Sequence, residues 1–168
     1  MCSTRPFLFL HPMKYTRLTQ QQLEELHPEF INFLAKQSIT AEEWSDLKSD
    51  KPEVAEQELD VFSDLIWEGV LNRVEYLENI SERHMHLFYL TEKEMKLFSV
   101  KVLNPEIDLR TEQGFSWFKR NFQSDFVEYL TAAKAYSDDK NQDKFGLIQQ
   151  GAVITKGQLY QWFEQIME

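Results

Sequence analysis

Two histidines are separated by one residue in the segment HMHLFYL at 84–90. On a β-strand the side chains of His84 and His86 would point to the same face, because successive side chains alternate between faces. Two imidazoles on one face could bind a metal ion, with a distant carboxylate as a third ligand, either Glu82 or one from the acidic row at 56–68. The alternative is that both rings face solvent. His84, His86 and Glu82 are the metal-site candidates that we select.

A second group of candidate residues is aromatic. The segment after Thr111 carries more large rings than one helix face usually buries, at Phe115, Trp117, Phe118 and Phe122. An exposed aromatic patch is typical of a surface that another protein covers. The alternative is that the rings fill a groove beside the central helix expected at 52–80. With that alternative open, we predict that these four residues form an interaction surface.

Carboxylates recur every four residues at Glu56, Asp60, Asp64 and Glu68. This spacing aligns them along one side of a helix. Such a row is usually the solvated face of an amphipathic helix, but it could also bind a metal or imitate a nucleic-acid backbone. A nucleic-acid mimic would need the whole row exposed.

No stretch of the sequence carries a catalytic or cofactor-binding signature. We find no G-x-S-x-G elbow, no P-loop and no G-x-G-x-x-G fingerprint, and the five glycines form no phosphate-cradling loop. The single cysteine, Cys2, lies in a segment that we expect to be a tail, where a nucleophile could not be held in place. We therefore predict no catalytic residue and no cofactor, and we favour a non-enzymatic role.

The composition excludes some classes of partner and indicates the cellular compartment. The 168 residues carry a net charge of −10, with a pI near 4.9, which argues against broad adhesion to nucleic acid or anionic membranes. One cysteine allows no intramolecular disulfide, and no apolar run approaches the roughly 18 residues of a membrane-spanning helix. We expect a cytoplasmic protein.

The stretch from Pro52 to Ile80 predicts the central element of the fold. Its apolar residues recur in steps of three, four and five, which suits a helix, and Pro52 fits the first helical position. Thr19, Thr40 and Thr155 each fit a capping box and predict the starts of three further helices.

After residue 81 the pattern becomes that of strands. Segments 84–90 and 95–102 are rich in aromatic and branched residues and predict a β-hairpin. Thr91 and Glu94 also fit a capping box, so a helix at 92–100 is the competing interpretation.

Thr111 predicts the start of a further helix. Ser124 predicts the start of another, which runs through Leu130 and Ala133. The tetrapeptide VEYL occurs at 74–77 and again at 127–130, which we interpret as chance because the flanks differ.

Together these patterns predict a mainly α fold of the α+β class, a single-domain helical assembly around a long central helix with one small β-hairpin. Residues 1–12, MCSTRPFLFLHP, do not share the regular pattern that opens at Met13. We expect them to be a flexible tail upstream of a true start at Met13, and residues 13–168 to form the domain.

Several stretches resemble a family of small proteins from Bacteroidetes-type bacteria with no established activity: MKYTRLTQQQLEELHPEFINFLA, PEVAEQELDVFSDLIWEGVLNRVEYLENIS, IDLRTEQGFSWF and QQGAVITKG. The likeness covers about residues 13–166 and implies no functional residues. Some members carry the label histidyl-tRNA synthetase. The residues here do not support that label, since the sequence has no F-R-x-E-type motif with an associated arginine for ATP.

The expected function is that of a non-catalytic, cytoplasmic protein-interaction or regulatory protein whose partner is another protein. One alternative is a metal-binding protein or metal-dependent enzyme that uses the region of His84 and His86. A second alternative is an acidic nucleic-acid mimic. No pattern in the sequence identifies the partner or sets the oligomeric state.

Overall fold

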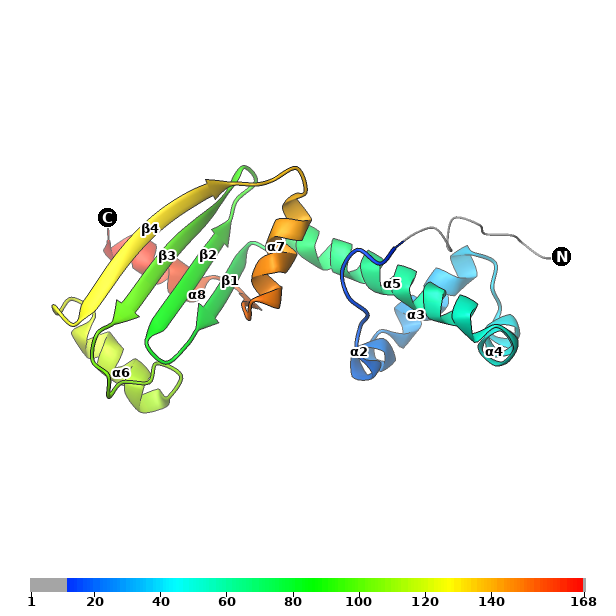
Figure 1. Ribbon diagram of the computed structural model, residues 1–168, viewed down its shortest axis with the longest axis horizontal. Coiled ribbons are helices and arrows are strands. Elements are labelled where there is room, and N and C mark those ends of the chain that lie inside the picture. Colours follow the sequence, from blue (N-terminus) through cyan, green and yellow to red (C-terminus); the bar gives the residue numbers. More distant parts are fainter. Residues whose placement is uncertain (1–11, 168) are drawn as a thin grey trace. The chain divides into compact units, whose positions relative to one another are not determined.

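The computed structural model describes residues 12–167 (Figure 1). The helices within this range are α2 (Gln20–Glu25), α3 (His27–Lys36), α4 (Ala41–Asp50), α5 (Pro52–Arg73), α6 (Glu112–Asn121), α7 (Lys140–Gln149) and α8 (Gln158–Ile166). The strands are β1 (Tyr76–Ile80), β2 (His84–Leu90), β3 (Glu94–Val102), β4 (Val127–Ala135) and β5 (Val153–Thr155). The predicted tail lies outside the described residues, apart from Pro12.

The fold is α+β with a substantial antiparallel sheet, so the prediction of a mainly helical assembly with one hairpin is wrong. The sheet has five strands in the order β4-β3-β2-β1-β5. The predicted hairpin is confirmed as β2 and β3. The three other strands come from segments whose sequence patterns predict helices or a connection.

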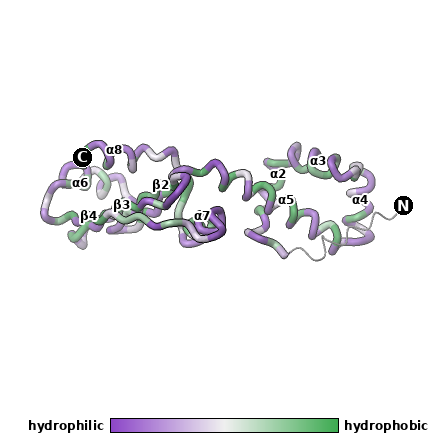
Figure 2. The backbone as a smooth tube through the Cα atoms, turned by 90° about the horizontal axis from the view of Figure 1, so that it is seen from above, coloured by the Kyte–Doolittle hydropathy of each residue, from purple (hydrophilic) through white to green (hydrophobic). Residues whose placement is uncertain are grey.

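The chain divides into two compact units, and the boundary falls inside α5, between Val70 and Leu71. The single domain expected for residues 13–168 stays a prediction. In the first unit, helices α2 to α5 enclose a core of Leu18, Phe30, Leu34 and Phe62. Figure 2 shows α5 alternating between apolar and polar segments along its length, as expected for a helix with one buried side. No helix among residues 12–167 combines the length and the apolar character needed to cross a membrane.

Two of the predicted capping boxes are confirmed. The hydroxyl groups of Thr19 and Thr40 accept hydrogen bonds from the backbone N–H groups of Gln22 and Glu43, whose side chains accept hydrogen bonds in return from the threonine N–H groups. These pairs satisfy donors that the first turn of a helix leaves free. Helices α2 and α4 therefore start where the sequence predicts.

In the second unit, helices cover the two faces of the sheet unequally. Helices α6 and α8 pack on one face, where Phe118 and Phe163 contact a core that includes Met85, Leu87 and Val100. Helix α7 packs on the other face through Leu147 and Ile148. Figure 1 shows α8 behind the sheet and α7 at one end of its opposite face.

The predicted capping box at Thr155 is wrong because Thr155 belongs to β5, where it pairs with Tyr76. Helix α8 starts instead after Gly157, whose φ of 79° lies in the left-handed region that favours glycine. A Cβ at Gly157 would come within 2.4 Å of the Tyr76 ring, so a larger residue would not fit.

The predicted helix from Pro52 to Ile80 ends early, at Arg73. The buried ammonium group of Lys144 in α7 donates hydrogen bonds to the carbonyl oxygens of Leu71 and Val74, at 2.8 and 3.0 Å. A cation at this position satisfies carbonyl groups that the end of a helix leaves free. The chain can then leave the helix and enter β1, which pairs with β2 and β5.

We expect that Lys144→Met will lower the free energy of unfolding by about 2–4 kcal/mol, because two buried carbonyl groups lose their donor. Burial lowers the pKa of Lys144, and Lys140 nearby lowers it further. Urea unfolding followed by circular dichroism measures the change. Lys156→Met, at an exposed position, is the control and should change stability by less than about 0.5 kcal/mol. Equal effects of the two substitutions would contradict the role given to Lys144.

Candidate functional site

The structure places the two predicted metal-site histidines side by side on β2. The rings of His84 and His86 lie nearly parallel with their centroids 6.0 Å apart, and Nδ1 of His86 is 3.2 Å from the hydroxyl oxygen of Ser99. Burial lowers the pKa of His86, and the neighbouring His84 lowers it further. Within residues 12–167 no group of three or more His, Cys, Asp or Glu side chains is arranged to hold a metal ion.

Glu82, the third candidate ligand, lies beside a guanidinium group. Arg110 forms ion pairs with Glu82 at 3.0 Å and with Asp108 at 2.9 Å, and it holds the pKa of Asp108 below its usual value. Glu82, His84 and Arg110 line a pocket of about 500 Å³ together with Arg83 and Lys101. The surroundings of Glu82 are thus rich in positive charge, which disfavours a metal cation. The metal site stays a prediction without a third ligand in the described part of the chain.

The four predicted interaction residues lie in and beside the core of the second unit. Phe118 is fully buried, and its ring centroid lies 5.7 Å from that of Phe163. Phe115, Trp117 and Phe122 are partly buried and pack against the same core. The rings are thus largely internal, as in the alternative interpretation, but they pack against the sheet and α8 and not beside the central helix. Phe118 has no exposed surface to offer a partner.

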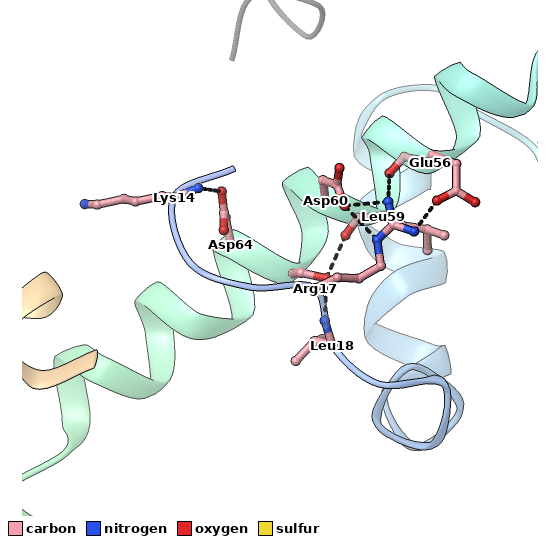
Figure 3. A network of polar contacts seen from close by, with 8 residues as sticks. Lys14, Arg17, Leu18, Glu56, Leu59, Asp60 and Asp64 are labelled. Carbon is pink, nitrogen blue, oxygen red and sulfur yellow. Dashed lines mark hydrogen bonds and ion pairs between the residues drawn. The ribbon is translucent and has the colours of Figure 1, made fainter. Parts of the chain in front are cut away.

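The acidic row on α5 binds the chain's own N-terminal segment (Figure 3). The backbone N–H groups of Lys14 and Tyr15 donate to the two carboxylate oxygens of Asp64 at 2.7 and 2.9 Å. Arg17 donates to Asp60 at 2.7 Å and also pairs with Glu56. Because these carboxylates are paired internally, the row is not the free anionic surface that a nucleic-acid mimic needs.

The strongest candidate for a binding surface is the free edge of β4. The N–H group of Leu103 donates to the carbonyl of Phe126 at 2.7 Å, which turns the backbone groups of Phe126 toward β3. Backbone direction alternates along an antiparallel strand. It follows that the even-numbered residues of β4 bond to β3, and that the odd-numbered residues direct their N–H and C=O groups away from the sheet. The outward-directed residues are Val127, Tyr129, Thr131, Ala133 and Ala135. The N–H group of Val127 already donates to the carbonyl of Ser124 at 3.2 Å, so at this position only the carbonyl group is directed outward.

This edge is long and little protected. β4 has nine residues, and residues 130–135 are all exposed. Proteins usually protect such edges with proline, bulges, several charges or a very short strand. β4 contains no proline and two charged residues, Glu128 and Lys134. The edge strand on the opposite side of the sheet, β5, has three residues. Figure 1 shows β4 as the outermost strand along its side of the sheet.

A groove of about 470 Å³ lies between α7 and the sheet, next to this edge. Apolar side chains from the strands form much of its lining, and polar residues of α7 stand on the other side. The groove is lined by Phe88, Met95, Leu97, Ala132, Ala133, Lys134, Gln142, Asp143, Gly146, Leu147 and Gln150. A Cβ added to Gly146 would meet no other atom within 4 Å, so this glycine leaves open space.

Sequence reasoning missed β4 because it assigned these residues to a helix capped by Ser124. Ala132 and Ala133 are good helix formers, and pairing with β3 overrides that local preference. One signal was present in the sequence. The tetrapeptide VEYL leads into β1 at 74–77 and into β4 at 127–130, so the interpretation of the repeat as chance left out a shared strand preference.

Comparisons with known proteins give a match to a family model. The model described as "Family of unknown function (DUF6495)" matches residues 13–168, a range that includes β4 and α7. A search of curated proteins finds no match, and a search of solved structures finds none either. The resemblance to a family without an established activity is confirmed at that level.

We expect that Asp64→Ala will lower the free energy of unfolding by about 2–4 kcal/mol, since two backbone N–H groups lose a charged acceptor. Chemical denaturation measures the loss. Asp46→Ala, which removes an exposed carboxylate on α4, is the matched control and should have little effect. If Asp64→Ala were as mild as the control, the acidic row would not be what holds the N-terminal segment.

Proposed function

We propose that this chain, which belongs to the family of unknown function DUF6495, is a non-catalytic interaction protein that binds an extended strand of another polypeptide along the edge of β4. The observation that carries the proposal is the run of four outward-directed residues, Tyr129, Thr131, Ala133 and Ala135, on a nine-residue edge strand that is exposed over most of its length. Strand addition of this kind uses main-chain hydrogen bonds for affinity. A cytoplasmic setting is part of the proposal.

The groove beneath α7 supplies the second requirement of strand addition, a place for side chains. Specificity in this binding mode comes from pockets that accept alternate side chains of the added strand. Ala132 and Lys134 belong both to β4 and to the groove lining. A strand added beside β4 would extend the face of the sheet on which α7 packs. Every second side chain of the added strand would then point toward the mouth of the groove. Apolar walls formed by Phe88 and Leu97 favour an apolar side chain there.

A proline at the centre of the edge tests the proposal. Thr131 directs its N–H group outward, so Thr131→Pro removes a donor for the added strand and leaves the bonds to β3 in place. We expect peptides selected from a displayed random library to bind Thr131→Pro at least tenfold more weakly than the unchanged chain, measured by isothermal titration calorimetry.

Thr131→Ser keeps the N–H group and serves as the matched control, with binding within about threefold of the unchanged chain. Hydrogen exchange should show protection of the odd-numbered amides of β4 when peptide is bound. The selection is made at a concentration at which the chain is monomeric. The proposal fails if no peptide is enriched there, or if enriched peptides bind the proline and serine variants equally.

A second test fills the groove. Gly146→Leu places a side chain in the open space beside α7, and we expect peptide affinity to fall about tenfold or more because the pocket for the peptide's side chain is occupied. Gly69→Leu is the control, since Gly69 also lies within a helix with open space at its Cβ and is not among the residues that line the groove. If Gly146→Leu bound peptide as tightly as the unchanged chain, the groove would not bind a side chain of the peptide.

A further inference from the structure

We propose that the strand that β4 accepts is the β4 strand of a second copy of this chain, so that the protein forms a symmetric dimer through one continuous sheet. This inference rests on the proposed function, because it names the partner of the same edge. A pairing in which one patch meets the identical patch of a second copy must be self-complementary. The sequence of β4 meets this requirement.

The nine residues of β4, VEYLTAAKA, are complementary to themselves in an antiparallel arrangement centred on Thr131. Glu128 is the second residue of the strand and Lys134 the second from its end. With Thr131 opposite the partner's Thr131, each Glu128 lies opposite the partner's Lys134. Opposite charges directly across two strands stabilise their pairing. Both side chains are exposed, and neither forms an ion pair within the described residues.

The same register matches large residues with small ones. Tyr129 lies opposite the partner's Ala133, and Leu130 opposite the partner's Ala132. The two central threonines face each other, a cross-strand pair that is favourable in antiparallel sheets. Leu130 has 62% of its surface exposed, and in the dimer it would lie against an alanine that lines the groove of the partner.

Backbone direction agrees with this register. In an antiparallel ladder the residues that exchange hydrogen bonds lie opposite each other. With the centre at Thr131, the outward-directed residues of one strand face those of the other, and about eight backbone hydrogen bonds can form, since the N–H group of Val127 is already bonded to Ser124. Moving the centre to Leu130 keeps most of the hydrogen bonds but places two leucines opposite each other and separates Glu128 from Lys134. Charge and size together select Thr131.

Charge reversal tests the dimer. We expect the full chain to sediment as a concentration-dependent dimer. Glu128→Lys and Lys134→Glu should each raise the dissociation constant of the dimer at least tenfold, because each converts two attractive cross-strand pairs into repulsive ones. The double variant should return to within about threefold of the unchanged chain. An equimolar mixture of the two single variants should form heterodimers, since every pair is then complementary.

The two single variants guard against effects on folding. Glu128 also lies opposite Lys101 on β3, whereas Lys134 lies opposite Met95, so a folding defect in one need not appear in the other. The inference is overturned if the full chain is monomeric at millimolar concentration, or if it dimerises but neither reversal weakens the dimer. A monomer whose peptide binding is still abolished by Thr131→Pro would overturn the dimer alone. A monomer that binds no strand-forming peptide would overturn the proposed function as well.

Discussion

The buried ammonium group of Lys144 determines where the long helix stops and the sheet begins. It donates to the carbonyls of Leu71 and Val74, which lie about seventy residues earlier in the chain. Asn141, one turn earlier in α7, donates to Asn72 at 2.8 Å and strengthens the same junction. Because the helix ends there, residues 76–80 are free to pair with strands on both sides. This contact therefore stabilises the junction at which the chain leaves α5 and enters β1, between β2 and β5.

Features encoded by neighbouring residues could be predicted from the sequence. The capping boxes at Thr19 and Thr40 involve residues three apart, and the hairpin of β2 and β3 joins adjacent segments through a turn in which the hydroxyl of Thr91 accepts from the N–H of Glu94. The features that could not be predicted depend on distant partners. Residues 76–80 continue the apolar periodicity of α5, so only Lys144 and the neighbouring strands show that they leave the helix.

The candidate site shows the same limit for a different reason. The histidines, carboxylates and aromatic rings stand out in the sequence because their side chains could do chemistry or bind a partner. In the structure Phe118 belongs to the core, and residues 14–18 are held by carboxylates of α5 together with the hydroxyl group of Ser63. The exposed edge of β4 consists of backbone groups whose direction is set by pairing with β3. No side-chain pattern predicts the direction of these backbone groups. The symmetric placement of Glu128 and Lys134 around Thr131 indicates self-pairing only when residues 127–135 are known to form a strand.

The shortness of β5 has a consequence for growth beyond two copies. A sheet with two long free edges could add molecule after molecule and build a filament. Here a symmetric pairing through β4 would consume the long edge of both molecules, and the edge left at each end would be a strand of three residues. So short a template offers few hydrogen bonds to an incoming chain. Polymerisation would therefore terminate after the first encounter, which allows an unprotected edge to persist in an assembly of finite size.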